Sequence, residues 1–275
     1  MVESKHYLVG ISAEDYIHPR EKAMKLNQDV GLISKGLDAL NDLSVAMARR
    51  ITLGRHIAVN AQTAPVVDLA IRDVCCILDY PVVPRVYICH QAAQTLTCTG
   101  TDQQQITLSD YILDQYDVDM LYFSFGNLIS MFKAGHVRLV TICSFMPEVP
   151  AAIAFEVPLL AYLRAADLSS DRGGLLACQN FSAAARCILW DAGIPVTETR
   201  DLSETEIIRT CEEYIKSVEF YAPNWMSELS VKAGNLTMMS MPHAYRLKEL
   251  LSWYKDGYTE LVSRYSEGVR GRMFR

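Results

Sequence analysis

Side chains able to do chemistry are concentrated in the ten-residue block DLSSDRGGLL, residues 167–176. The block holds two carboxylates, Asp167 and Asp171, and the guanidinium of Arg172. Groups of these types serve as metal ligands, proton carriers or ion-pair partners, depending on their surroundings. The glycine pair that follows them is isolated and lacks the spacing of a phosphate-binding loop. The role of these side chains therefore depends on the helices and strands that position them.

The cysteines and histidines offer a second set of candidates, but they complete no known site pattern. The eight cysteines contain no C-x-x-C pair and mostly stand in apolar surroundings, so we interpret them as reduced, buried thiols of a cytosolic protein. Cys89 precedes His90, but the partner pairs that a metal site needs are missing. Cys143 and Cys178 lack a histidine partner in the sequence, and no G-x-S-x-G elbow occurs. A cysteine or serine hydrolase is therefore disfavoured.

Composition and charge argue against nucleic-acid and membrane partners. The 275 residues carry a net charge of −6 and no long basic run, and the arginines near the end are interpreted as part of a solvated tail. The apolar stretch 139–163 is interrupted by prolines and glutamates, which favours buried helices over a membrane span. Residues 1–15 hold too short an apolar run for a signal peptide. We therefore expect a cytoplasmic protein.

The helix predicted over 118–135 is the element around which the others are arranged. Its apolar residues recur at three- and four-residue steps, which places them on one face that packs into a core. Asp117 or Asp119 is suited to cap its start. His136 is expected to favour its end, as a cation or a carbonyl partner.

The other elements follow from apolar spacing and turn residues. Helices are predicted over 21–50, 64–78, 109–115, 182–191, 204–218 and 243–265. A further helix is predicted to begin at Asp167 or Ser169. Strand-like runs are HIAVNAQ, PRVYICH, QTLTCTG and QQQITLS, and a hairpin turn at 100–102 joins the last two. We predict one α+β domain over 1–275, mostly helical, with a small antiparallel sheet.

The order of these pieces resembles the zinc metallopeptidases of family forty-eight, the group of the protease HtpX and the CAAX prenyl proteases, in its soluble bacterial branch. That family carries H-E-x-x-H on a helix that follows a small sheet, and later an E-x-S-x-D-R block that continues into Gly-Leu-Leu. Here the block 167–176, the following FSAAARCILWDAGIP and the stretch from Pro242 to Trp253 are similar to the family's. The likeness covers 19–253 and implies a zincin-like scaffold.

The resemblance also implies where the family's catalytic residues would stand. The two histidine ligands correspond to Asn127 and Met131, the glutamate base to Leu128, and the third ligand to Asp167. The aspartate that orients a zinc-binding histidine corresponds to Asp171. Together with Arg172 it is expected to remain as a structural pair near a helix start.

These substitutions remove the family's chemistry. Zinc catalysis needs three strong protein ligands and a general base that takes a proton from the metal-bound water. An amide, a thioether and one carboxylate are poor zinc ligands, and Leu128 has no titratable group. We therefore expect no cofactor, with Leu128 and Met131 filling the space of the metal. Asn127 then needs hydrogen-bond partners, from Asp171 or the region of Ser169.

Three functions of different classes stay open. The first is a catalytically inactive family member, a pseudopeptidase, that binds a protein or peptide. An extended peptide would then add to the strand edge at Gln94, Thr95, Leu96 and Thr97. The second is a zinc metalloendopeptidase with unorthodox ligands, in which zinc depends on Asp167. The third is an interaction or assembly protein, including a homo-oligomer, that uses another surface such as the aromatic-rich segment 225–265.

Overall fold

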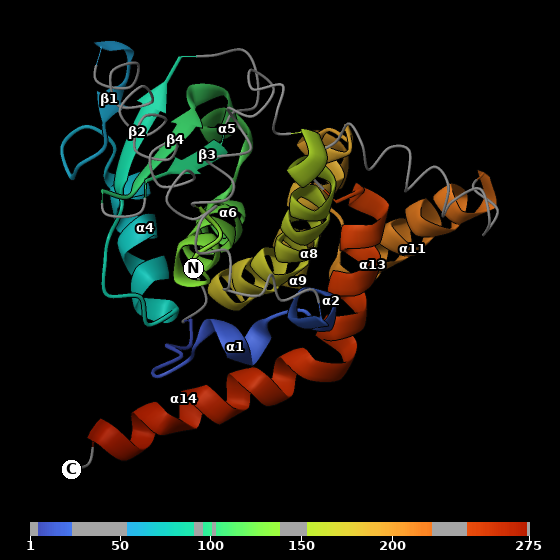
Figure 1. The fold of residues 1–275 in the computed structure, drawn as a ribbon. Coiled ribbons are helices and arrows are strands. Elements are labelled where there is room, and N and C mark those ends of the chain that lie inside the picture. The colour runs from blue at the N-terminus through green and yellow to red at the C-terminus, as the bar shows by residue number, and fades with distance from the viewer. Residues whose placement is uncertain are drawn as a thin grey trace.

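The computed structural model describes residues 5–23, 54–90, 96–100, 103–137, 153–221 and 241–273 (Figure 1). Most of the helix predicted over 21–50 lies outside these ranges, as do parts of 139–163 and 225–265. The described part combines helices with a small sheet, which confirms the α+β class. None of the helices in it is long and apolar enough to cross a membrane.

Two long helices form the centre of the molecule, α6 (Val118–Lys133) and α8 (Ile153–Cys178). They pack against each other more extensively than any other pair of described elements (Figure 1). The prediction of a helix over 118–135 is thus confirmed. Its cap is confirmed too, because the Asp117 side chain accepts a hydrogen bond of 2.9 Å from the backbone N–H of Met120.

The prediction that a helix begins at Asp167 or Ser169 is wrong, because α8 runs through both positions. Serine and aspartate start helices when their side chains bind free backbone N–H groups of the first turn. Here the hydroxyl of Ser170 donates back to the carbonyl of Ala166 at 3.0 Å, as a hydroxyl inside a helix does. Asp167 and Ser169 accept hydrogen bonds from backbone N–H groups outside α8. These side chains therefore fasten α8 to other segments and do not cap it.

Glycines set the short distance between α6 and α8. A Cβ atom placed on Gly126 would lie 2.4 Å from the Cβ of Ala177. One placed on Gly173 would lie 1.7 Å from the hydroxyl oxygen of Ser130. Neither position has room for a side chain. The glycine pair of the block 167–176 therefore serves helix packing.

The described sheet has the strand order β1-β2-β4-β3. Its strands are β1 Ile57–Ala58, β2 Arg85–Cys89, β3 Leu96–Thr99 and β4 Gln105–Ser109. β3 and β4 pair antiparallel, as the predicted hairpin requires, and Gly100 follows β3 at a φ of +83°, which favours glycine. β2 and β4 run parallel, so the prediction of an antiparallel sheet is wrong. After β2 the chain forms β3 at the edge of the described sheet. The hairpin then places β4 between β3 and β2, where it runs parallel to β2.

The remaining helices pack around this centre (Figure 1). They are α1 Ala13–Tyr16, α2 Pro19–Ala23, α4 Pro65–Ile77, α5 Asp110–Gln115, α9 Phe181–Asp191, α10 Val196–Thr199, α11 Glu204–Tyr221, α13 His243–Trp253 and α14 Thr259–Met273. The predictions for α4, α5, α9 and α11 are confirmed to within a few residues. The last predicted helix contains a π-helical turn, Tyr254–Tyr258, between α13 and α14. Buried apolar side chains from the sheet and from these helices form one cluster.

Candidate functional site

Asn127 on α6 faces Asp171 on α8. The amide nitrogen of Asn127 donates a hydrogen bond of 3.0 Å to Asp171 Oδ1, which confirms the expected partner. Asp171 is 1 % exposed. A buried carboxylate is costly unless hydrogen bonds and an opposite charge compensate it. Asn127 supplies one of the three side-chain donors that do so.

The other two donors come from Arg246 of α13. Its Nε donates to Asp171 Oδ2 at 2.8 Å and its Nη2 to Oδ1 at 2.7 Å, a bidentate pair. Its Nη1 lies 3.2 Å from Asp191 Oδ2, at the end of α9. Burial lowers the pKa of Arg246, but Asp171 and Asp191 together raise it well above its ordinary value. Arg246 thus stays charged and links three helices.

Asp167 lies one helical turn before Asp171 and is partly buried. Its Oδ2 accepts a hydrogen bond of 2.8 Å from the backbone N–H of Met241. Burial raises the pKa of Asp167 to about 7, with a smaller contribution from Asp171 and against the opposing effect of Arg246. Near neutral pH this carboxyl is therefore protonated in a large part of the molecules. A protonated carboxyl is a poor metal ligand.

Leu128 and Met131 complete the positions that the resemblance singles out. Leu128 is 6 % exposed and belongs to the main core, and Met131 is partly buried against that core. Among the residues that the structure describes, no three His, Cys, Asp or Glu side chains gather in a way that could hold a metal ion. A zinc ion does not fit the side chains at 127, 131 and 167, because they offer an amide tied to Asp171, a thioether and one carboxyl of raised pKa.

Arg172 does not pair with Asp171, so the expected Asp171–Arg172 pair is wrong. Neighbouring residues of a helix point about 100° apart. Arg172 accordingly reaches a different side of α8, where it donates to the backbone carbonyls of Tyr16 and Ile17, each at 3.4 Å. Its guanidinium lies 5.1 Å from the ring centre of Trp253, a cation–π distance. Arg172 therefore fastens the N-terminal segment and α13 to α8.

His136 belongs to a buried polar cluster that the sequence did not indicate. Of its two expected roles, the contact with a helix-end carbonyl is not what the structure gives, since its Nε2 lies 2.7 Å from Glu21 Oε1 of α2. The role as a cation stays a prediction. The other oxygen of Glu21 accepts a hydrogen bond from the Ser169 hydroxyl. Burial raises the pKa of Glu21, but these partners lower it below its ordinary value overall. His136 and Glu21 are 115 residues apart, so no local pattern connects them.

β3 lies at the edge of the described sheet, with β4 as its only neighbour there. Two of the residues predicted to form a peptide-binding edge lie on it, namely Leu96, which is partly buried, and Thr97, which is exposed. The other two, Gln94 and Thr95, lie outside the described residues. Within the part of the chain that the structure describes, no strand pairs with the outer side of β3.

The described cysteines form no second site. All of them are free, and all except Cys76 are buried. Burial raises the pKa of Cys98 and Cys178 to about 12, which keeps these thiols protonated and unreactive. His90 bonds Asp110, and Cys89 donates to a backbone carbonyl. Cys143 lies outside the described residues.

The aromatic segment 225–265 is described from Met241 onward. In that part Trp253, Tyr254 and Tyr258 are partly buried against the core. Tyr254 also stacks on Phe181 of α9, with ring centres 4.6 Å apart. These aromatic side chains contribute to the packing of α13 on the rest of the molecule.

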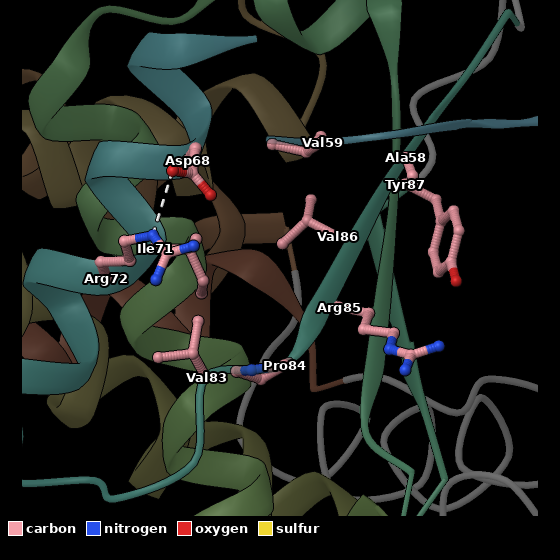
Figure 2. Close-up of a pocket in the computed structure, with 10 residues that line it drawn as sticks. All are labelled: Ala58, Val59, Asp68, Ile71, Arg72, Val83, Pro84, Arg85, Val86 and Tyr87. Atoms are coloured by element: carbon pink, nitrogen blue, oxygen red, sulfur yellow. Dashed lines mark hydrogen bonds and ion pairs between the residues drawn. The ribbon is translucent and has the colours of Figure 1, made fainter. Parts of the chain in front are cut away.

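A cavity of about 470 Å³ lies away from these residues, between α4 and β2 (Figure 2). Its walls include Ile71 of α4 and Val86 of β2, and neither Asn127 nor Asp167 lines it. This cavity is thus separate from the positions that would correspond to the catalytic centre of the metallopeptidases.

Comparison with known proteins places the chain in no family. No protein-family model matches it, and neither a curated protein nor a solved structure matches it. The resemblance to the metallopeptidases accordingly stays a prediction from the residues quoted for it. The function has to be inferred from the geometry of the site.

Proposed function

We propose that this chain is a catalytically inactive homologue of the zinc metallopeptidases that binds polypeptide. The hydrogen-bonded group Asn127–Asp171–Arg246 is the observation that carries the proposal. In the proposed correspondence Asp171 would orient a zinc-binding histidine at position 127. Here Asn127 takes that hydrogen bond and Arg246 neutralises the carboxylate. The negative charge of Asp171 is therefore balanced by Arg246, and no metal ion is needed to compensate it.

In the same correspondence, no general base would be present for peptide hydrolysis. Position 128 would carry the group that takes a proton from the attacking water, and a buried leucine cannot do so. Apolar packing at 128 and 131 is favourable in itself, since it replaces a solvated polar site by core contacts. The scaffold would therefore keep its shape without keeping its activity.

Polypeptide binding is supported by the edge position of β3. An edge strand presents unpaired backbone N–H and C=O groups, which an extended peptide can satisfy by adding as a further strand. The exposed Thr97 side chain stands on this strand. The partner that fits is an extended segment of another protein, bound through its main chain.

The absence of a functional metal is tested by metal analysis of the purified full chain. We expect well under one zinc per chain after gel filtration in buffer supplemented with zinc. Stoichiometric zinc that is lost in Asp167→Ala would overturn the proposal and support the metalloendopeptidase alternative.

Peptide binding is tested with a photo-crosslinking amino acid incorporated at Thr97. The matched control carries the same amino acid at Arg209, an exposed position on α11. We expect crosslinks to extended peptides from a random library at Thr97 and not at Arg209. Equal labelling at both positions, or labelling at neither, would contradict the assignment of β3 as the binding edge.

A further inference from the structure

The short helix α2 lies beside α8 and is attached there by ionisable side chains (Figure 1). Of the side chains at positions 18 to 22, two are buried, His18 at 7 % and Glu21 at 2 % exposure. Those at 19, 20 and 22 are exposed. Neither buried side chain is apolar, so within this range the attachment of α2 depends on hydrogen bonds of groups that gain or lose protons.

The surroundings of His18 suit a neutral ring. Its Nδ1 accepts a hydrogen bond of 3.1 Å from the backbone N–H of Arg20, so the ring proton stands on Nε2, 3.0 Å from Glu249 Oε2 of α13. A second proton, on Nδ1, would face the N–H of Arg20 and break this contact. Burial lowers the pKa of His18 below its ordinary value of 6.5, against the opposing effect of Glu249. Protonation of His18 therefore favours detachment of α2.

The surroundings of Glu21 suit a carboxylate. Its Oε1 lies 2.7 Å from His136 Nε2 and accepts from the Tyr162 hydroxyl at 3.3 Å, and its Oε2 accepts from the Ser169 hydroxyl. Ser169 in turn accepts a hydrogen bond of 2.9 Å from the backbone N–H of His18. Burial raises the pKa of Glu21, but these partners lower it overall below its ordinary value of 4.5. A neutral carboxyl is a weaker acceptor, so protonation of Glu21 also favours detachment.

The other ionisable groups that face these two side chains are arginines and tyrosines. Arg172 of α8 and Arg20 act on His18, and Arg20 also lies 5.4 Å from the ring centre of Tyr245 on α13. Tyr16 acts on Glu21, and burial raises the pKa of Tyr16 to about 12. Burial lowers the pKa of Arg172 to about 10. These groups therefore keep their charge states between about pH 8 and about pH 4.

We propose that α2 is a pH-sensitive cover over the buried His136 ring and Ser169 hydroxyl, closed at neutral pH and opened by acidification. His18 acts as the pH falls through about 6.5, and Glu21 acts below about 4.5. Opening gives solvent access to His136 and Ser169. Ser169 is two residues from both Asp167 and Asp171, about 200° around the helix. The cover therefore acts on a different side of α8 from the candidate site and does not depend on the proposed function.

The test is hydrogen exchange of the full chain, followed by mass spectrometry of a peptide that covers residues 18–22. The backbone N–H of Lys22 reports on α2, because it donates to the carbonyl of His18 at 3.1 Å in the closed form. Each exchange rate is divided by the intrinsic rate at the same pH, since the exchange reaction itself depends on pH. We expect the protection of α2 to fall at least about threefold from about pH 8 to about pH 5, while that of α4 stays unchanged.

Two variants assign the effect to the two buried side chains. His18→Gln keeps a donor toward Glu249 but does not titrate, so it should lose most of the fall in protection. Glu21→Gln lacks the carboxylate and should lower the protection of α2 at every pH. The matched controls His90→Gln and Glu14→Gln alter exposed side chains and should behave like the unaltered chain.

The unaltered chain alone can overturn the proposal, so the test does not depend on the folding of a variant. Protection of α2 that stays constant from about pH 8 to about pH 5 would do so. A fall that is equally large in α4 would show a loss of stability of the whole fold, and would also contradict a local cover. The same holds for a fall that His18→Gln leaves unchanged, or for a Glu21→Gln chain as protected as Glu14→Gln.

Discussion

Asp171 is the residue on which the candidate site depends most. It receives hydrogen bonds from Asn127 and, twice, from Arg246, at a position that is 1 % exposed. A buried ion pair of this kind adds little net stability when compared with apolar packing. Removal of one partner is nevertheless costly, because the other charge is left buried and uncompensated.

We therefore expect Asp171→Asn to lower the free energy of unfolding by about 3–5 kcal/mol. The measurement is urea unfolding followed by circular dichroism. The control is Glu260→Gln, which breaks the exposed Glu260–Arg264 pair of α14 and should cost less than about 1 kcal/mol. Adding Arg246→Gln to Asp171→Asn should restore part of the loss. Equal effects of the buried and the exposed substitution would refute the central role of this pair.

Asp167 gives the site a dependence on pH. Its pKa of about 7 lies above the ordinary value of 3.8, so between these limits the folded chain holds a proton that the unfolded chain has released. Its contribution to stability is then present below about pH 4 and is lost as the pH rises through about 7. Asn at this position keeps an acceptor for the Met241 N–H and carries no charge.

We expect Asp167→Asn to melt about 2–4 °C above the unaltered chain at pH 8 and at about the same temperature at pH 4. Thermal unfolding at several pH values measures the difference. Asp256→Asn, at an exposed position, should show no such trend. A stabilisation by Asp167→Asn that is the same at both pH values would show that the charge of Asp167 is not its cause.

At the scale of elements, the contact between α6 and α8 positions the site. It is close because Gly126 and Gly173 carry no side chain, and this closeness places Asn127 beside Asp171. The polar cluster of His136, Glu21 and Ser169 joins the end of α6 to α2 and α8. The geometry of the candidate site is therefore a property of helix packing, and small changes in that packing should affect it.

Gly173→Ala should destabilise the fold by about 1–3 kcal/mol, since the added methyl group would lie 1.7 Å from the Ser130 hydroxyl oxygen. Gly54→Ala is the matched control, because nothing lies within 4 Å of a Cβ at Gly54. Chemical denaturation compares the two. If Gly173→Ala were as stable as Gly54→Ala, the close approach of α6 and α8 would be incorrect.

At the scale of the whole molecule, local patterns predicted the elements better than their arrangement. The apolar spacing and the Asp117 cap specify α6, and the turn residues specify the β3–β4 hairpin, because these depend on neighbours in the chain. The parallel pairing of β2 and β4 depends on the path of the chain between them, which no short motif encodes. The continuity of α8 was missed because Asp167 and Ser169 also suit a helix start.

The contacts of the candidate site likewise include some that the sequence predicted and some that it did not. The pairing of Asn127 with Asp171 was predicted through the resemblance, which places an aspartate at 171 beside the side chain at 127. The bidentate contact of Arg246 and the partner of His136 were not, since each joins residues more than seventy positions apart. Arg172 shows that adjacency in sequence is a poor guide to pairing within a helix, because Asp171 and Arg172 serve different neighbours.

We propose that the side chains at 127, 131 and 167 have replaced the ligands of a zinc ion. If the scaffold is otherwise intact, restoring the ligands should restore the metal. Asp171 already bonds the side chain at 127, so a histidine placed there would find its orienting carboxylate in position.

The most direct measurement is therefore the zinc content of the triple variant Asn127→His, Met131→His and Asp167→Glu beside that of the unaltered chain, by mass spectrometry after gel filtration. Circular dichroism establishes that both are folded. We predict about one zinc per chain in the variant and less than about a tenth of that in the unaltered chain. A folded variant without zinc, or an unaltered chain with stoichiometric zinc, would contradict the account.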